Sequence, residues 1–455
     1  MKRLSKRGFA VIIGLVLILS LFDSRFIFKV NAAANANPSW TVDEKLILHS
    51  QCNPYDYYAA KDPTIVYYGG KYLVYYTGAN QSGGWQMCFT SASTLSGLKT
   101  APRTYMNKIG ESYFCAPELF YFEPQQLWYL IYQDGTYGAA YATSTNPADP
   151  NSWSGPKSLG ISGNMGWDYY IICDDQYAYM YNTPSDGSGK LYMRKTALSN
   201  FPNKGWSAPT VACTNVFEAA SVYKSLADNQ YYLLVEAMLD GRSYELFTSS
   251  SAGGPWKLVN NKWATKSNLT KYLSDKWTTN VSHGELIRAG YNQKLEINDI
   301  NKVDFLIQGT TDLSGDYQKI HWDLGIIRNY TSDASNVTQV ECENMTTGGS
   351  YAGKITSPFA GVALYANNDF CSYNQYFAYA THSFSLRGCS SNSGTARVDL
   401  QIGGNTVGSF YFTGTTPTVQ TLTNVSHGTG NQEIKLVVTT DSGSWDAYVD
   451  YLQYK

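Results

Sequence analysis

Three carboxylates at the edges of short strand-like runs are the residues best suited to do chemistry. Asp62 lies in AKDPTIVYY (60–68), Asp168 in GWDYYIICDD (166–175) and Glu218 in VFEAASVYK (216–224). Such a set is typical of glycosidic bond hydrolysis, in which one carboxylic acid protonates the leaving oxygen and a second carboxylate activates water or attacks the sugar. A third carboxylate often tunes the acid, because neighbouring charge and burial set the pKa of a carboxyl group.

Each of these carboxylates also has a purely structural explanation. Asp62 precedes Pro63, which is expected to hold it in an extended conformation, and a lone Asp-Pro pair more often serves local backbone amides. Asp168 comes directly before an apolar run, and Glu218 sits among apolar residues. Apolar surroundings raise the pKa of a carboxyl group toward the value that a general acid needs, but a buried structural glutamate paired with Lys or Arg has the same sequence pattern.

The composition favours a neutral, polyhydroxylated ligand over a polyanion. The 455 residues carry 34 Lys and Arg against 36 Asp and Glu, a net charge of −2, so the charge balance does not point to nucleic acid as a partner. Charged residues make up only 15% of the chain, whereas Tyr occurs 38 times and Trp 11 times. Aromatic rings cover the C–H faces of sugars, although most of these rings are expected to fill β-sheet cores.

Residues 1–34 have the pattern of a secretory signal. An apolar run from Phe9 to Phe22 follows a basic start and precedes small residues at Ala32 and Ala34, where cleavage is expected. The alternative is an uncleaved membrane anchor, but the run is shorter than the roughly 20 residues of a spanning helix. We therefore expect an extracellular protein with no membrane association after cleavage. The basic residues are Lys2, Arg3, Lys6 and Arg7.

Eight cysteines leave the disulfide pattern open. Export permits disulfides, but spacing alone does not give the pairing. Five cysteines precede residue 330 and three follow it, so two separately folding parts would each hold an odd number. No Cys-x-x-Cys pair exists, which argues against a structural zinc site. The cysteines are Cys52, Cys88, Cys115, Cys173, Cys213, Cys342, Cys371 and Cys389.

The elements that must position the carboxylates are predicted to be all β. From about Trp40 to Arg328, short strand-like runs alternate with Gly, Asn, Asp and Pro, and no long stretch has an apolar period of 3.6 residues. A region of this length accommodates a β-propeller better than a single sandwich, which places the propeller at 35–329. Residues 330–337 are polar and unpatterned and are interpreted as a linker. Residues 338–455 alternate strands and turns again and predict a small β-sandwich.

Nine runs across the first domain stand in the order of one family of enzymes. They are KDPTIV (61–66), APELFYF (116–122), WYLIYQ (128–133), WSGP (153–156), DYYIICD (168–174), FEA (217–219), YYLLVEA (231–237), WTTNVSHGEL (277–286) and LIQG (306–309). With them, the region from about residue 40 to 330 resembles glycoside hydrolase family 62, the arabinofuranosidases. The resemblance implies a five-bladed β-propeller, in agreement with the strand pattern.

The resemblance also implies roles for the carboxylates. Asp62 matches the general base and Glu218 the general acid. Asp168 matches the third carboxylate, which orients the acid and tunes its pKa. The family inverts configuration, which implies that Asp62 and Glu218 lie about 6.5–9.5 Å apart with a water beside Asp62.

Further positions match the substrate pocket of the family. Lys61 and Gln133 match positions near the arabinose, and Tyr244 is expected to keep a place in the pocket. His283 matches a histidine near a central ion, usually calcium, although imidazole is a poor calcium ligand and a satisfied core histidine is the alternative. The chain departs from the family at Arg242-Ser-Tyr-Glu-Leu246 and at Ala219-Ala220-Ser221, which puts the rim around the xylan chain in doubt.

Two groups of acidic residues in the second domain suggest calcium. Asp441 and Asp446 flank a Gly-containing loop and could chelate a hard cation with a carbonyl between them, although a turn without an ion is the alternative. Glu341 and Glu343 alternate near the start of the domain, and Asp450 lies near its end. Terminal strands often meet in small sandwiches, so these three residues suggest another site.

Residues 338–455 resemble the family 36 carbohydrate-binding modules. The resemblance is carried by VECENM (340–345), GSYAGKI (349–355), GVALYA (361–366), TPTVQTL (416–422) and WDAYVD (445–450). It implies xylan binding through a calcium ion held by Asp441, Asp446 and the carbonyl of Trp445, with Tyr351 and Tyr365 against the xylose rings. It also implies a structural calcium at Glu341, Glu343 and Asp450. Cys342, Cys371 and Cys389 depart from the family, and one pair of them could form a disulfide.

The expected protein is an exported monomer in which a propeller removes α-L-arabinofuranosyl branches from arabinoxylan by inversion and a sandwich holds it on xylan. One alternative is a related family 43 propeller acting as a xylosidase or arabinanase. The other is a xylan-binding protein without catalytic activity.

Overall fold

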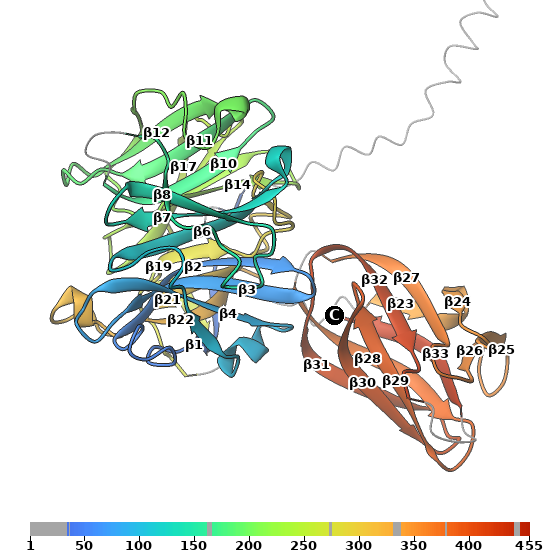
Figure 1. Ribbon diagram of the computed structural model, residues 1–455. Coiled ribbons are helices and arrows are strands. Elements are labelled where there is room, and N and C mark those ends of the chain that lie inside the picture. The colour runs from blue at the N-terminus through green and yellow to red at the C-terminus, as the bar shows by residue number, and fades with distance from the viewer. Residues whose placement is uncertain are drawn as a thin grey trace, which may run out of the picture. The chain divides into compact units, whose positions relative to one another are not determined.

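The computed structural model of the protein (Figure 1) describes residues 34–35, 37–161, 166–272, 275–330, 338–377, 380–440 and 446–455. The chain divides into two compact units, residues 1–33 and residues 34–455, and the first lies outside the described residues. The predicted signal, apart from residue 34, and the predicted linker, apart from residue 330, therefore also lie outside them. In the described ranges, no helix is long and apolar enough to cross a membrane.

The described residues between Trp40 and Arg328 form five sheets, which confirms the predicted five-bladed β-propeller. Blade 1 holds β2 (Ala59–Tyr68), β3 (Lys71–Ala79), β4 (Trp85–Ala92) and β5 (Arg103–Tyr105). Blade 2 holds β6 (Phe114–Phe122), β7 (Leu127–Asp134), β8 (Gly138–Ser144) and β9 (Lys157–Ser158). Blade 3 holds β10 (Trp167–Cys173), β11 (Tyr177–Thr183), β12 (Lys190–Ala197) and β13 (Thr210–Thr214).

Blades 4 and 5 recruit strands from distant parts of the chain. Blade 4 holds β14 (Ser221–Ser225), β15 (Tyr231–Ala237), β16 (Ser243–Ser249) and β17 (Lys257–Ala264), with β20 (Glu296–Ile297) parallel to β14. Blade 5 holds β19 (Ser282–Leu286), β21 (Asp304–Gly309), β22 (Asp323–Arg328), β1 (Trp40–Ile47) and β18 (Leu269–Tyr272). Because β1 pairs with β22, the start and the end of this region share one sheet and close the ring.

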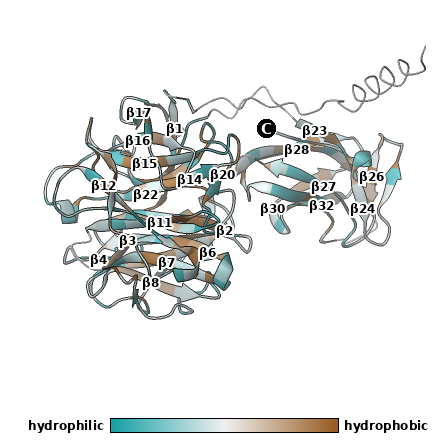
Figure 2. Cartoon of the chain, turned by 90° about the horizontal axis from the view of Figure 1, so that it is seen from above, coloured by the Kyte–Doolittle hydropathy of each residue, from teal (hydrophilic) through white to brown (hydrophobic). Residues whose placement is uncertain are grey.

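Local sequence explains the hairpins within each blade. The turn between β2 and β3 consists of Gly69 and Gly70, which have φ values of 57° and 78°, the conformation that a two-residue hairpin turn requires. Strand β3 is buried at every position after Lys71, because both faces of a blade pack on neighbours. Figure 2 shows hydrophobic segments concentrated in the strands and hydrophilic ones in the connections.

The C-terminal part of the chain folds as a β-sandwich, as predicted. One sheet has the order β25 (Gly353–Ile355), β26 (Gly361–Leu364), β33 (Ala447–Tyr454), β28 (Thr381–Ser390) and β31 (Thr418–Ser426), with β23 (Thr338–Glu341) on β33. The other has the order β24 (Thr346–Gly348), β27 (Phe370–Phe377), β32 (Gly430–Val437), β29 (Thr395–Ile402) and β30 (Asn405–Thr413). The pairing of β23 with β33 confirms that the terminal strands meet.

Short 3₁₀-helices complete the described elements. They are η1 (Ser96–Lys99), η2 (Glu123–Gln125), η3 (Leu198–Asn200), η4 (Tyr317–Lys319) and η5 (Cys342–Asn344).

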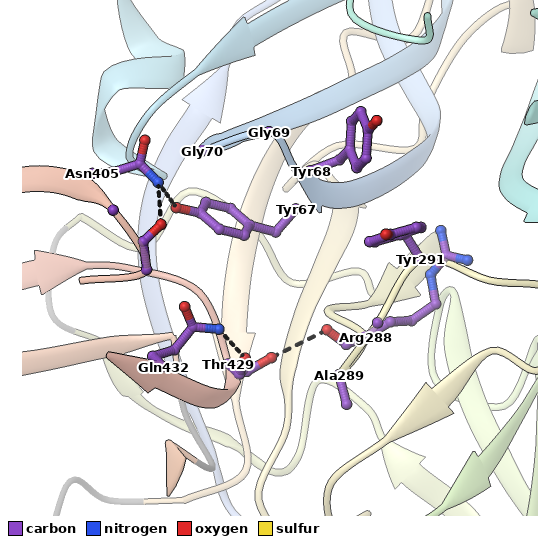
Figure 3. Close-up of a pocket in the computed structure, with 13 residues that line it drawn as sticks. Tyr67, Tyr68, Gly69, Gly70, Arg288, Ala289, Tyr291, Asn405, Thr429 and Gln432 are labelled. Carbon is purple, nitrogen blue, oxygen red and sulfur yellow. Dashed lines mark hydrogen bonds between the residues drawn. The ribbon is translucent and has the colours of Figure 1, made fainter. Parts of the chain in front are cut away.

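Residues of the propeller and of the sandwich line a cavity of about 440 Å³ (Figure 3). On its sandwich side, Asn405 donates from Nδ2 to the Tyr67 hydroxyl (3.4 Å) and Thr429 donates from Oγ1 to the Arg288 carbonyl (3.3 Å). The buried Tyr72 hydroxyl also donates to the His427 carbonyl (2.7 Å).

Candidate active site

The three predicted carboxylates come together in one cavity of about 310 Å³ in the propeller. Asp62 comes from β2 of blade 1, Asp168 from β10 of blade 3, and Glu218 from the segment before β14 of blade 4. Lys61, Gln133 and His283, which the sequence also singled out, line the same cavity. The described residues that line the cavity are Lys61, Asp62, Trp85, Tyr113, Cys115, Gln133, Trp167, Asp168, Glu218, His283 and Tyr317.

The backbone that presents these side chains is in an unusual conformation. Asp62, Ala116, Asp168 and Ala219 have φ values of 45°, 51°, 57° and 55°, the left-handed region that non-glycine residues rarely occupy. In the first three blades, the pairing of the innermost strand shifts around this residue. Such bulges re-aim a side chain, and strained residues of this kind cluster at functional sites.

The structure corrects the prediction that Pro63 holds Asp62 in an extended conformation. Asp62 is left-handed instead, and the pairing of β2 with β3 shifts between Lys61 and Thr64. Pro63 lies inside this break, where its missing N–H interrupts no ladder bond. In blade 5 a corresponding shift lies between Ser282 and Gly284, on either side of His283.

Asp62 lies between two cationic groups. Its Oδ1 is 3.2 Å from Nδ1 of His283 and 3.6 Å from Nζ of Lys61. Burial raises the pKa of Asp62, but the charges of Lys61 and His283 outweigh it and lower that pKa to about 2. Its backbone N–H donates to Oε1 of Gln308 (2.8 Å), whose Nε2 donates to Oγ of Ser282 (2.9 Å). Asp62 is therefore a fixed, ionised carboxylate.

Asp168 has the opposite electrostatic character. Burial, together with the charges of Glu218 and Asp62, raises the pKa of Asp168 to about 7, although His283 opposes the shift. Its Oδ2 accepts a hydrogen bond from the backbone N–H of Ala219 (3.1 Å), the residue after Glu218. Its own N–H donates to Oε1 of Gln133 (3.1 Å). Asp168 thus contacts the segment that carries Glu218, as a positioning role requires.

Glu218 is held from both its backbone and its side chain. The carbonyl of Glu218 accepts from the N–H of Glu236 on β15 (2.8 Å). Nη1 of Arg242 donates to Oε1 of Glu218 and to Oε2 of the fully buried Glu236 (2.8 Å to Glu236). The sequence offered two explanations for Glu218, a catalytic acid and a structural glutamate paired with a cation. The structure shows both a place in the cavity and a cationic partner.

Aromatic side chains form the rest of the wall near Asp62. Lys61 donates from Nζ to the Tyr317 hydroxyl (3.0 Å), and its ammonium lies 4.6 Å from the centre of the Trp85 ring. The Asp316 carboxylate caps η4 by accepting from the N–H of Gln318, which fixes the turn that carries Tyr317.

Tyr244 does not line the cavity among the described residues. It is fully buried, its hydroxyl accepts from the N–H of Gly284 (3.1 Å), and it donates to the carbonyl of Ala219 (3.5 Å). The side chain therefore supports, from beneath, the segments that carry His283 and Glu218.

Nδ1 of His283 faces two carboxylates, with Oδ1 of Asp62 at 3.2 Å and Oδ1 of Asp168 at 3.8 Å. Burial lowers the pKa of His283, but Asp168 and Asp62 outweigh it and raise that pKa to about 9. The ion that the resemblance implies near His283 stays a prediction. Across the described ranges, no group of three or more His, Cys, Asp or Glu side chains is placed to hold a metal.

The sandwich presents its two predicted tyrosines on one structural support. The side chain of Tyr351 is 68% exposed and that of Tyr365 is 39% exposed, as sugar-contacting rings must be. The fully buried Asp369 accepts from the N–H of Tyr351 at Oδ1 (3.0 Å) and from those of Tyr365 (3.0 Å) and Ala366 (3.1 Å) at Oδ2. Asp369 was not predicted, because its position in Asn-Asn-Asp gives no signal beyond that of a turn.

The predicted calcium ligands are only partly covered by the described residues. Asp441 and Trp445 lie outside them, and the N–H of Asp446 donates to Oγ of Ser391 (2.7 Å).

At the second predicted calcium site, Glu343 has a buried oxygen, Oε2, without a hydrogen-bond partner among the described residues, which fits a cation. Glu341 instead accepts from Gln339 (2.6 Å), and Asp450 pairs with Arg387. Both calcium sites therefore stay predictions.

The other functional residues that the sequence analysis missed lie in the propeller. Gln308 lies inside a matching run, and Arg242 lies in a segment that departs from the family. Gln308 contacts Asp62 and Arg242 contacts Glu218 from other parts of the sequence, so no local sequence pattern connects the members of each pair. They are Trp85, Tyr113, Cys115, Trp167, Glu236, Arg242, Gln308 and Tyr317.

A five-bladed propeller with carboxylates from three blades in one cavity has the architecture of a glycoside hydrolase. The family model described as "Glycosyl hydrolase family 62" matches residues 39–328, and the chain belongs to this family. An α-L-arabinofuranosidase from Podospora anserina, solved in complex with cellotriose, is 32% identical and superimposes with a TM-score of 0.60, covering 65% of this chain and 98% of that one.

Two curated relatives match different shares of the chain. Alpha-L-arabinofuranosidase C of Cellvibrio japonicus (strain Ueda107) is 35% identical over 299 residues, 64% of this chain and 46% of the relative. The arabinoxylan arabinofuranohydrolase of Paenibacillus polymyxa is 66% identical over 120 residues, 26% of this chain and 19% of the relative. The chain thus spans less than half the length of either relative.

The C-terminal part of the chain matches a family 36 carbohydrate-binding module. A solved module of this family, in complex with calcium and xylotriose, is 67% identical and covers 26% of this chain and 99% of its own, with a TM-score of 0.26.

Proposed function

We propose that the protein is an exported α-L-arabinofuranosidase that removes arabinofuranosyl side chains from arabinoxylan with inversion of configuration. The observation that carries this proposal is the meeting of Asp62, Asp168 and Glu218, from three blades, in one cavity of about 310 Å³. Membership of family 62 and the names of the two curated relatives support the same substrate class.

Asp62 suits the role of general base. With a pKa lowered to about 2, it is ionised at neutral pH and can accept a proton from water. Its link through the backbone to Gln308 keeps it in place without occupying its carboxylate. In an inverting reaction, the attacking water sits beside this carboxylate, on the side of the sugar opposite to the leaving oxygen.

Glu218 suits the role of general acid. It lines the cavity together with Asp62, and Arg242 and the backbone of β15 hold it from behind. Protonation of the leaving oxygen by Glu218 and attack by the water at Asp62 then occur on opposite faces of the arabinose. Inversion requires a separation of about 6.5–9.5 Å between the two carboxyl groups, which leaves room for the water.

The shape of the cavity favours a single terminal sugar over a polymer backbone. Its volume is near the lower end of the roughly 300–1,000 Å³ range of small-molecule sites. Trp85, Tyr113, Trp167 and Tyr317 supply aromatic faces, and Lys61 and Gln133 supply polar groups. A pocket of this kind fits an arabinofuranose that projects as a side chain from xylan.

The sandwich would hold the enzyme on the xylan chain through calcium. The exposed rings of Tyr351 and Tyr365 suit contact with xylose, and the resemblance assigns a calcium ion to Asp441, Asp446 and the Trp445 carbonyl. Calcium is a hard cation that oxygen ligands of this type can hold, and it would coordinate the sugar hydroxyls. The second set, Glu341, Glu343 and Asp450, would hold a structural calcium.

The test is proton NMR of the products from wheat arabinoxylan, followed from the first minutes. Release of arabinose first as its β-anomer supports an inverting arabinofuranosidase with Asp62 and Glu218 as base and acid. Arabinose appearing first as the α-anomer would contradict inversion. Release of xylose or of oligosaccharides would favour a xylosidase or arabinanase. An inactive sample beside an active control enzyme would favour a xylan-binding protein.

A further inference from the structure

We propose that the protein carries two disulfide bonds, Cys52–Cys88 in the propeller and Cys342–Cys371 in the sandwich, and that the other four cysteines stay reduced. All eight side chains are thiols in the structure. The inference takes export from the proposed function and is otherwise independent of catalysis. One bond in each domain leaves three thiols in the propeller and one in the sandwich, which agrees with the odd numbers of five and three cysteines.

In the propeller, the thiols of Cys52 and Cys88 lie in one buried cluster and contact each other. Cys88 is in the middle of β4, and Cys52 belongs to the segment that leads into β2. Burial and the neighbouring Cys52 thiol raise the pKa of the Cys88 thiol well above its ordinary value. The thiols of Cys52 and Cys88 are therefore buried and in direct contact, as the sulfurs of a structural disulfide are.

The backbone already curls the Cys52 segment over blade 1. The fully buried Asp56 accepts from the N–H of Cys52 at Oδ1 (2.7 Å) and from the Tyr76 hydroxyl at Oδ2 (3.1 Å). Tyr76 in turn pairs with Cys88 across β3 and β4. A bond between Cys52 and Cys88 would therefore join a segment and a blade that Asp56 already links through Tyr76.

In the sandwich, Cys342 and Cys371 form the corresponding pair. Both are fully buried in the domain core, and their thiols contact each other. Cys342 opens η5, and Cys371 lies on β27 opposite Thr347 of β24, the strand that follows η5. The bond would fix η5, which carries Glu343, against β27, the strand with which β24 pairs.

The remaining cysteines have no comparable neighbour among the described thiols. Cys173 and Cys213 lie on β10 and β13, with two strands between them, about 14 Å at the usual strand spacing. A disulfide needs Cα atoms within about 7 Å. Cys115 lies in the active-site cavity beside Tyr113. Cys389 is on β28, in the sheet that does not contain Cys371.

The chemistry requires an electron acceptor. For each bond, two thiols lose two protons and two electrons as the sulfur–sulfur bond forms, and a disulfide oxidant of the export compartment takes them up to become a dithiol. Exchange proceeds through a thiolate and a mixed disulfide. Because the folded chain buries these sulfurs and raises the pKa of Cys88 and of Cys342, both bonds would have to form before folding is complete.

The test is a labelling map of the full-length protein, exported by its own N-terminal segment. The protein is denatured, alkylated with one reagent, reduced, alkylated with a second reagent and digested for mass spectrometry. Cys52, Cys88, Cys342 and Cys371 should carry only the second label, and the unreduced digest should contain peptides that join Cys52 to Cys88 and Cys342 to Cys371. The first label on all eight cysteines, or any other joined pair, would overturn the proposal.

Variants sharpen the result without depending on activity. Cys52→Ser should remove only the propeller cross-link, and Cys371→Ser only the sandwich cross-link, whereas the matched control Cys389→Ser should remove neither. Reductant should lower the melting temperature of the wild type and of Cys389→Ser. Equal melting of the oxidised and reduced wild type would show that the bonds do not constrain the fold. The labelling map of the wild type stands even if a variant fails to fold, and loss of arabinose release would leave it unchanged.

Discussion

At the scale of single residues, the cavity separates three carboxylates by their surroundings. Asp62 faces two cations and has a pKa of about 2, whereas Asp168 is buried beside other carboxylates and has a pKa of about 7. Carboxylates pushed apart in this way take different roles in acid–base catalysis. Glu218 differs again, because an arginine contacts it directly.

The first prediction concerns Glu218. Glu218→Gln keeps the size of the side chain and its contact with Arg242 but removes the proton that the leaving oxygen needs. We expect arabinose release from arabinoxylan to fall by about 10²–10⁴-fold, the usual contribution of a general acid. Xylan binding, measured by pull-down on insoluble polymer, should not change. Full activity of the variant would show that another group supplies the proton.

The second prediction follows from the raised pKa of His283. A histidine with a folded pKa of about 9 and an ordinary value of 6.5 stabilises the fold fully below pH 6.5 and loses that contribution as the pH rises through 9. His283→Gln should therefore lower the free energy of unfolding in acidic buffer, where Asp62 stays ionised beside His283. Chemical denaturation should show this difference shrinking to near zero by about pH 10.

The exposed His321 provides the control for that measurement. His321→Gln should leave the pH dependence of unfolding as it is in the wild type. A loss of stability in His283→Gln that is the same at every pH would mean that packing, not the ion pairs with Asp62 and Asp168, accounts for the effect.

The third prediction concerns Asp369, which holds the backbone under both exposed tyrosines. Asp369→Asn weakens the bonds to the N–H groups of Tyr351 and Tyr365, and bonds to a charged acceptor are worth about 1.5–3 kcal/mol each. We expect the Kd for xylohexaose, measured by calorimetry, to rise by about tenfold, which corresponds to about 1.4 kcal/mol. The buried Asp399, which pairs with Arg397, offers Asp399→Asn as the matched control. An equal loss of binding in both variants would indicate general destabilisation of the sandwich.

At the scale of elements, the sequence predicted the strands better than the blades. The hairpin of β2 and β3 was predictable because alternation and two glycines mark it locally. The blades have no repeat visible in the sequence, and β18 and β20 join their sheets by parallel pairing with distant strands. The left-handed turn at Asp62 was not predictable, because the rule for a residue before proline points to extended backbone.

The β15–β16 hairpin shows why part of the site was missed. Arg242 lies between the two strands, and it meets Glu236 of its own hairpin and Glu218 of the preceding segment. The resemblance identified the three carboxylates because each lies in a characteristic run. Arg242 works through a geometry that only the folded hairpin creates.

The fourth prediction uses this hairpin. Arg242→Met leaves the buried Glu236 without its cation, and breaking a buried pair costs about 3–5 kcal/mol. The double variant Arg242→Met/Glu236→Gln removes the stranded charge and should recover most of the stability in thermal denaturation. It should not recover arabinose release, because Glu218 still lacks its positioning contact. Recovery of both would reduce Arg242 to a purely structural partner of Glu236.

At the scale of the whole molecule, the proposed function assigns chemistry to the propeller and attachment to the sandwich. The proposed catalytic carboxylates are all in the propeller, and the exposed tyrosines and all predicted calcium-site residues except His283 belong to the sandwich. A tethered module raises the local concentration of substrate without adding a contact at the catalytic site. The attachment should therefore matter for the polymer and not for a small substrate.

The fifth prediction tests this division with Asp441→Ala in the full-length protein. The change removes a predicted calcium ligand far in the sequence from the catalytic carboxylates, so hydrolysis of a small aryl arabinofuranoside should stay within about twofold of the wild type. Binding to insoluble xylan should be lost, and release of arabinose from insoluble arabinoxylan should fall by at least about tenfold, since tethering commonly contributes 10²–10⁴ to overall avidity.

Chelation of the wild type separates the ion from the residue in that experiment. A chelator should reproduce the effect of Asp441→Ala on the polymer, and added calcium, but not magnesium, should reverse it, because magnesium demands a stricter octahedral shell and gives up its waters reluctantly. The variant should not respond to either ion. Xylan binding that persists in chelator would rule out a calcium bridge and leave the exposed rings of Tyr351 and Tyr365 as the main contact. A parallel loss of small-substrate hydrolysis would instead place an ion in the propeller, where the resemblance implies one near His283.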